Sequence, residues 1–232
     1  MNHIKHLIDI KSAFLFDLFH TLTSIEQTSP GMFKTADILG VDRKRWTEQL
    51  LNNSIERLTG KLKDPYKIIE KMAHSIDPNI PNEIIKKATD KRIEFFKKAI
   101  IEMPQSSIDT IIYLKNRNKK LALISNADFM EKMAWDFCPI AQYFDAVIFS
   151  CEVGYVKPQK EIYEIAIKNL NESPSNCVFV GDGGSNEFYG AKNLGMTTIM
   201  VKGVVEKNWP EKVKVQMEYA DYIINDVNEL IV

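Results

Sequence analysis

The 232-residue sequence contains no long apolar run. Its longest uncharged apolar stretches, such as residues 13–16 and 146–149, are far shorter than the roughly 20 residues needed to cross a bilayer. Residues 1–11 mix charged and histidine side chains with isolated Ile and Leu, so the continuous apolar centre of a secretory signal peptide is missing. We therefore expect a cytoplasmic protein with no membrane segment.

Neither sign of charge is in excess, and cysteine is scarce. Thirty basic and thirty-one acidic side chains leave a net charge of −1, so no overall field attracts nucleic acid or an anionic membrane. Cys138, Cys151 and Cys177 match no zinc-binding spacing, and we expect reduced, mostly buried thiols. The length predicts one large domain or one domain that carries an insert.

Short apolar runs predict a parallel β-sheet. The runs are continuous rather than alternating, which is typical of strands covered on both faces. Helical periodicity follows them, for example over residues 108–114, where Ser106 and Ser107 are predicted to cap the helix. A doubly wound, Rossmann-like α/β fold is therefore predicted. The runs cover residues 13–16, 121–124, 146–149, 178–180 and 198–201, and an edge strand is expected at 222–224.

A purely helical pattern replaces the strand pattern between about residues 28 and 101. One helix face is predicted over residues 41–58 with Asp42 as its N-cap, a second helix begins at Asp64 and Pro65, and a longer third follows. The expected organisation is an α/β core of residues 1–23 and 102–232, with an α-helical cap domain of residues 24–101. Four cap side chains could contact a substrate, although each also fits plain surface or cap core: Arg43, Arg45, Trp46 and Lys61.

Three polar side chains follow predicted strands. Asp17 and Ser125 come directly after apolar runs, and Asp182 comes after a run and one glycine. Taken singly, they fit a turn residue, a helix cap and a flexible turn. Ligands of open α/β sheets bind at the carboxyl ends of the strands, so together these residues predict a site at one sheet edge.

Lys157 adds a cation at the same edge, because it follows the strand of residues 146–149 and precedes Pro158 and a helix. Two aspartates that meet repel each other unless a divalent cation lies between them, and oxygen ligands suit Mg²⁺. Aspartate, Mg²⁺, serine and lysine together are suited to phosphoryl transfer. The carboxylate attacks, the cations neutralise developing charge, and the hydroxyl holds the transferred oxygens.

At these residues the chain resembles the haloacid dehalogenase (HAD) superfamily, of the type with a small helical cap inserted after the first motif. The four motifs lie in family order, and the resemblance covers essentially the whole chain. They are Phe16-Asp17-Leu18-Phe19-His20-Thr21-Leu22, Leu123-Ile124-Ser125-Asn126, Gly154-Tyr155-Val156-Lys157-Pro158 and Val180-Gly181-Asp182-Gly183-Gly184-Ser185-Asn186-Glu187.

The resemblance implies a role for each matched residue. Asp17 would be the nucleophile that forms an aspartyl intermediate, and Asp17, Asp182 and the backbone carbonyl of Phe19 would bind Mg²⁺. A small phosphorylated substrate is implied. Its transferred group would be held by Ser125 and Lys157, with Asn126 and His20 as further substrate-binding residues, and Glu187 and Asn186 would bind or support the metal.

Phe19 departs from the family pattern, because family phosphatases usually carry there a second aspartate that protonates the leaving group. General acid–base catalysis contributes about 10²–10⁴ in rate, so substrates with good leaving groups would be favoured. His20 replaces the usual next glycine, and it either shuttles the proton or packs or hydrogen-bonds at the cap hinge.

Three functions remain open at this point. The first is Mg²⁺-dependent phosphoryl hydrolysis. The second is 2-haloacid dehalogenation, which explains an aromatic residue at position 19 but does not need the magnesium-type fourth motif. The third is a catalytically weak HAD protein with a binding role. The sequence identifies neither the substrate nor the oligomeric state.

Overall fold

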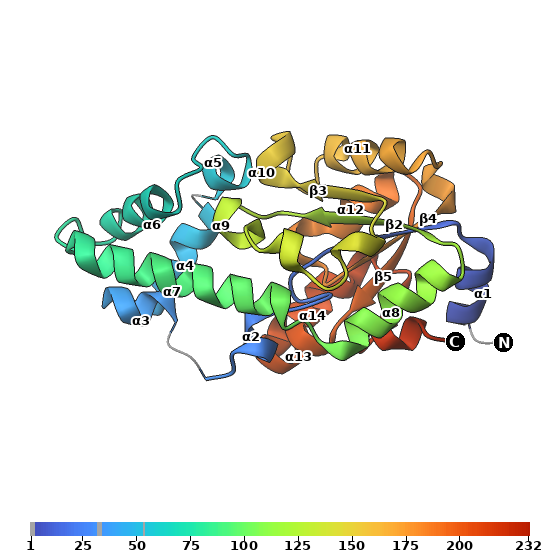
Figure 1. The fold of residues 1–232 in the computed structure, drawn as a ribbon, viewed down its shortest axis with the longest axis horizontal. Coiled ribbons are helices and arrows are strands. Elements are labelled where there is room, and N and C mark those ends of the chain that lie inside the picture. Colours follow the sequence, from blue (N-terminus) through green and yellow to red (C-terminus); the bar gives the residue numbers. More distant parts are fainter. Residues whose placement is uncertain (1–2, 32–33, 53) are drawn as a thin grey trace.

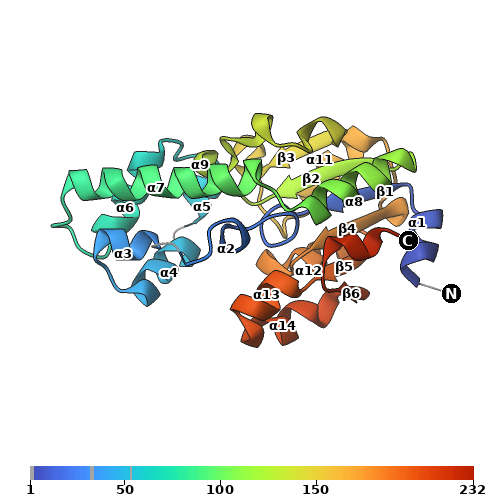
Figure 2. The same cartoon turned by 60° about the horizontal axis from the view of Figure 1, so that its bottom comes forward.

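A single parallel β-sheet forms the centre of the protein. The computed structural model describes residues 3–31, 34–52 and 54–232. Six strands lie in the order β3-β2-β1-β4-β5-β6, and every neighbouring pair is parallel (Figures 1 and 2). This order is that of a doubly wound sheet, so the predicted fold class is confirmed. The strands are β1 (Ala13–Phe16), β2 (Lys120–Ser125), β3 (Ala146–Phe149), β4 (Cys177–Gly181), β5 (Thr197–Val201) and β6 (Tyr222–Ile224).

Both faces of the sheet are covered, which explains why the strand sequences are continuously apolar. All four residues of β1 are buried. Successive side chains point to opposite faces. Phe14 and Phe16 pack with α1 (His3–Ile10) and α8 (Gln105–Asn116), whereas Ala13 and Leu15 pack with α11 (Lys160–Leu170) and α12 (Glu187–Asn193).

A helical segment extends away from the sheet between β1 and β2 (left in Figures 1 and 2). It has a hydrophobic cluster of its own, which includes Trp46, Ile69 and Ile85. The chain enters and leaves this segment at neighbouring points, because Thr23 Oγ1 donates to the carbonyl of Ala99 at 2.5 Å. Its helices are α2 (Ile25–Thr28), α3 (Thr35–Leu39), α4 (Arg43–Asn52), α5 (Ile55–Leu58), α6 (Pro65–His74) and α7 (Asn82–Ile101).

Two of the predicted helix starts are confirmed and two local predictions are wrong. Asp42 accepts from the amide of Arg45, and Asp64 caps α6. The helix predicted over residues 41–58 is instead two helices, α4 and α5. Ser106 and Ser107 do not cap α8, because that helix already begins at Gln105 after Pro104, and the Ser107 hydroxyl donates to the carbonyl of Leu22.

The remaining short helices flank the carboxyl ends of the strands. They are α9 (Phe129–Lys132), α10 (Ser150–Val153), α13 (Gly203–Asn208) and α14 (Pro210–Gln216). Cys138, Cys151 and Cys177 are free and buried, as predicted. No helix within the described ranges is both long enough and apolar enough to span a membrane.

Candidate active site

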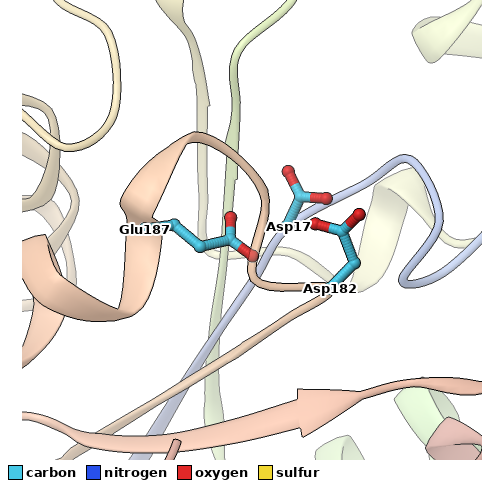
Figure 3. A group of neighbouring side chains, drawn as sticks. All are labelled: Asp17, Asp182 and Glu187. Atoms are coloured by element: carbon cyan, nitrogen blue, oxygen red, sulfur yellow. The ribbon is translucent and has the colours of Figure 1, made fainter. Parts of the chain in front are cut away.

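The first, second and fourth motifs meet at the carboxyl edge of the sheet because of strand register. Phe16 of β1 lies opposite Leu123 of β2 and Val180 of β4. Asp17 therefore leaves the sheet between the end of β2, at Ser125, and the turn at Asp182. The carboxylates of Asp17 and Asp182 point toward each other, and Glu187 approaches from the start of α12 (Figure 3).

Lys157 is buried at the centre of this group, with 4% of its surface exposed. Its ammonium nitrogen lies 2.5 Å from Asp17 Oδ1 and 2.6 Å from Glu187 Oε2. The backbone of Lys157 is fixed by Asn126, whose side chain accepts from the Lys157 amide at 2.8 Å and donates to its carbonyl at 3.1 Å. The second motif therefore holds the residue of the third motif in place.

Glycines in the fourth motif allow its two acids to approach the backbone. Glu187 Oε1 accepts from the amide of Gly183, and Asp182 Oδ1 accepts from the amide of Gly184, both at 2.8 Å. A Cβ atom at Gly181 would lie 2.1 Å from Glu187 Oε1, so any larger residue would displace this carboxylate. Gly183 has a φ of +87°, which glycine adopts without strain.

The site holds more acids than bases, and their pKa values reflect this. Burial raises the pKa of Asp17, and Asp182 adds to the shift against the opposing effect of Lys157. Burial, together with Asp17 and Asp182, raises the pKa of Glu187 to about 8. Lys157 is buried, but the carboxylates of Asp17 and Glu187 hold its pKa above its ordinary value. This group of acids therefore favours an additional cation.

A cation site can be formed from the described residues at this edge. One carboxylate oxygen each from Asp17, Asp182 and Glu187 lies within 4.8 Å of the others. An all-oxygen donor set of this kind fits Mg²⁺. All three acids also contact donors of the protein: Lys157 for Asp17 and Glu187, and the amide of Gly184 for Asp182.

His20 lies between two carboxylates at the rim of the site. Its Nδ1 is 3.5 Å from Asp182 Oδ2, and its Nε2 is 3.3 Å from Glu26 Oε2. Burial alone would lower the pKa of His20, but the two carboxylates outweigh it and raise the pKa to about 10. The ring of Trp209 packs edge-on against the imidazole at 5.1 Å. Nothing in the sequence pattern connects Glu26 or Trp209 with the motifs, and both were missed.

The first motif directs other side chains around the nucleophile position. Thr21 Oγ1 donates to Asp17 Oδ2 at 3.3 Å, a contact that its place within the motif could have suggested. Phe19 is half-buried and packs edge-on against Phe96 of α7, with 5.1 Å between ring centroids. The aromatic residue therefore joins the first motif to the helical segment.

The four side chains of the helical segment that could contact a substrate lie in different surroundings. Trp46 is buried in the hydrophobic cluster of the segment, and Arg43 pairs with Asp37. Arg45 donates to the carbonyl of Ile76, and Lys61 is exposed. The plain interpretation of Trp46 as core is confirmed.

Comparisons with known proteins identify relatives of this chain. A protein of Mus musculus described as bifunctional epoxide hydrolase 2 is 33% identical over 99 residues, 40% of this chain and 18% of that protein. A glyceraldehyde 3-phosphate phosphatase of Methanothermobacter thermautotrophicus is 30% identical over 138 residues, 58% of this chain and 59% of the relative. The chain thus spans less than two thirds of the length of either relative.

Among solved structures, an L-2-haloacid dehalogenase from Xanthobacter autotrophicus superposes with a TM-score of 0.64 at 18% identity, over 95% of this chain and 96% of the other. At this identity the likeness is one of fold alone. The model of the haloacid dehalogenase-like hydrolase family matches residues 11–195, most of the chain. The predicted resemblance is confirmed: the chain belongs to the haloacid dehalogenase-like hydrolase family.

Proposed function

We propose that the protein is a Mg²⁺-dependent phosphatase that acts on a small phosphorylated metabolite through an aspartyl-phosphate intermediate on Asp17. One observation carries this proposal. Asp17 has one oxygen 2.5 Å from the buried ammonium of Lys157 while its carboxylate faces Asp182, so a nucleophile is held beside a fixed cation and a candidate metal site. The identity of 30% to a glyceraldehyde 3-phosphate phosphatase supports the substrate class.

Asp17 and Asp182 would hold the magnesium ion, with the carbonyl of Phe19 as a further ligand and Glu187 and Asn186 as supporting residues. When bound, the ion would neutralise charge on the phosphoryl oxygens. The acid surplus of the site and its oxygen-only donors support this assignment. Glu187 would support the site by holding Lys157, whose Nζ lies 2.6 Å from Glu187 Oε2.

The protein's own groups divide the reaction between them. A carboxylate oxygen of Asp17 attacks phosphorus as the bond from phosphorus to the leaving-group oxygen breaks, and Lys157 neutralises charge on the transferred group. Ser125, at the end of β2, would hold a second phosphoryl oxygen, and Asn126 keeps Lys157 in position. Water then attacks the aspartyl phosphate, releases inorganic phosphate and restores the carboxylate.

The missing acid at position 19 determines which substrates react well. His20 is not free to donate its proton, because both ring nitrogens face carboxylates. A leaving group must therefore depart without a proton from the first motif, which favours acyl phosphates and aryl phosphates over alkyl esters. We propose that residues 24–101 form a cap domain that excludes water and selects the substrate.

A second candidate function is 2-haloacid dehalogenation. Phe19 favours it, because halide departs as a stable anion and needs no proton. The likeness in fold to the L-2-haloacid dehalogenase is compatible with either function. If the protein releases chloride from 2-chloropropionate at the same rate with and without EDTA, dehalogenation would be supported over phosphatase activity.

The decisive assay measures hydrolysis of acetyl phosphate and p-nitrophenyl phosphate with Mg²⁺ and with EDTA. We expect turnover that needs Mg²⁺ and that falls at least about 10³-fold in Asp17→Asn, because the nucleophile is removed. Asp9→Asn is the control, since Asp9 lies on the exposed face of α1 and its partners among the described residues are Lys5 and Arg117 at the surface. Turnover in Asp17→Asn equal to wild type would contradict the proposal. If the wild-type protein hydrolyses neither substrate, dehalogenation or a binding role would be favoured.

A further inference from the structure

A second buried cluster of charges joins the helical segment to the loop that follows Ser125. Arg57 of α5 donates to Asp128 Oδ2 at 2.9 Å and to Glu131 Oε1 at 3.3 Å. Arg92 of α7 donates to Glu131 Oε1 at 2.9 Å. We call Arg57, Arg92, Asp128 and Glu131 the latch cluster.

The latch cluster is almost completely withdrawn from water. Side-chain exposure is 8% for Arg57, 0% for Asp128, 8% for Glu131 and 13% for Arg92. Separating charges that are desolvated in this way is costly, because each would be left without its partner. The Nε of Arg57 is buried without a hydrogen-bond partner among the described residues. The other two guanidinium nitrogens of Arg57 bond to the two carboxylates and to the carbonyl of Leu50.

The carboxylates of the latch cluster also organise the loop backbone. Asp128 accepts from the amides of Met130 and Glu131, and Glu131 accepts from the amide of Asp128. The amide of Ala127 donates to Ser150. Each residue from Asn126 to Asp128 therefore has a fixed partner: Lys157, Ser150 or the latch cluster.

The backbones of the two parts also touch near the latch cluster. Gly60, two residues beyond α5, lies so close to the carbonyl oxygen of Cys151 in α10 that a Cβ would come within 2.0 Å of it. Figure 1 shows α5 beside α9 and α10, with α7 passing next to α9. The helical segment is thus seated on the loop after β2, and charged groups cross that contact.

We propose that Arg57 is a positioning residue, which holds the loop 125–128 through Asp128 and so places Ser125 and Asn126 for the phosphoryl group. This inference rests on the proposed function for its catalytic meaning. Arg57 does not touch the reacting atoms. The helical segment would then do more than cover the site, because removing Arg57 would loosen the loop that carries Ser125 and Asn126.

The primary test measures amide hydrogen exchange over residues 125–132 in the substrate-free protein. We expect Arg57→Met to speed exchange there by about tenfold or more, because the carboxylates that accept from these amides lose their partner. Arg57→Met combined with Asp128→Asn removes one charge of each sign while the asparagine can still cap α9, so it guards against global unfolding. Lys86→Met is the matched control, since Lys86 lies exposed on α7 of the same segment and, among the described residues, pairs with Asp90.

Kinetics with acetyl phosphate form the second readout. A variant that is merely less folded loses kcat at constant KM, whereas a misplaced loop also raises KM. We expect Arg57→Met to raise KM about tenfold, Arg57→Lys to recover much of the loss, and Lys86→Met to match wild type within about twofold.

Exchange over residues 125–132 that equals wild type in both Arg57→Met proteins would overturn the inference. So would a fall in kcat at constant KM. If wild type turns over no phosphorylated substrate, the proposed function fails, and the exchange experiment still decides whether Arg57 holds the loop.

Discussion

Two clusters of buried charge lie on either side of the loop after β2, and they differ in their balance. The latch cluster pairs two arginines with two carboxylates, Asp128 and Glu131. The site cluster contains Asp17, Asp182, Glu187, Lys157 and His20, with Glu26 at its rim, and so has four acids for two bases. The charges of the first cluster balance within the protein, and those of the second do not.

The pKa values of the two glutamates follow this difference, whereas burial raises the pKa of Asp128 in the latch cluster to about 6 and, against burial, His20 holds the pKa of Asp182 in the site below its usual value. Burial would raise the pKa of Glu131, but Arg57 and Arg92 hold it below its usual value. Burial raises the pKa of Glu187 to about 8, because Lys157 is shared with Asp17 and Asp182 lies nearby. A balanced cluster stabilises a joint between two parts of a fold, whereas a surplus of acid is retained where a cation or a reacting group is to be bound.

The largest effect is expected from lowering the acid surplus at the candidate metal site. Asp182→Asn should reduce kcat/KM for acetyl phosphate by about 10³-fold, because metal charge neutralisation is lost. It should also abolish the increase in Tm that Mg²⁺ produces in wild type by binding the folded state. Thermal unfolding with and without Mg²⁺ checks this. An equal Mg²⁺ response in wild type and Asp182→Asn would place the ion elsewhere.

Adding an acid to the site cluster should raise activity toward poor leaving groups. Phe19→Asp is expected to hydrolyse glycerol 3-phosphate about 10²-fold faster than Phe19→Asn, which is similar in size but cannot donate a proton. Both variants lose the packing on Phe96, so their comparison isolates the acid. Equal rates would show that leaving-group protonation does not limit the reaction.

Replacing a glutamate by glutamine should change the free energy of unfolding differently in the two clusters. Glu131→Gln leaves two buried arginines with one carboxylate and should lower the free energy of unfolding at pH 7 by about 3 kcal/mol. Glu187→Gln removes a surplus acid whose folded-state pKa is about 8, so it should leave stability unchanged or raise it while activity falls. Urea unfolding in EDTA measures both variants. Equal destabilisation would break the comparison between the clusters.

The smallest predicted effect concerns His20 and pH. Its folded-state pKa of about 10 lies above the unfolded value of 6.5, so its contribution is present below about pH 6.5 and is lost as pH rises toward 10. In EDTA, wild type should lose about 1–2 kcal/mol more stability than His20→Asn between pH 7 and pH 10, after allowance for its partial exposure. Asparagine tolerates the φ of +65° at this position. Parallel pH curves for the two proteins would argue against the contact with Asp182 and Glu26.

Much of the sheet was predictable because strands buried on both faces have little freedom in composition. The runs at 13–16 and 146–149 coincide with β1 and β3, and residues 222–224 form the edge strand β6. The carboxyl ends of such strands must meet, so the approach of Asp17 to Asp182 followed from order alone. The catalytic and metal-binding roles of these residues stay predictions.

Contacts between distant segments could not be predicted. Arg57 and Asp128 are 71 residues apart, and neither lies in a recognisable motif. Trp209 reaches His20 through a turn between two short helices, which no local pattern specifies. The helix start near Ser106 was wrong because Pro104 begins the helix earlier, and serine then bonds to a carbonyl instead of an amide. Local propensity gave way to tertiary contacts in each case.

The hydrogen bond between Thr23 and Ala99 has a consequence for how the architecture could vary. The two points where the chain leaves and rejoins the α/β core are adjacent, although 76 residues separate them in the sequence. An insertion whose ends meet in this way can be enlarged, shortened or exchanged for another module without altering strand order or register. The sheet edge could thus keep one chemistry while exchangeable inserts adapt it to different substrates.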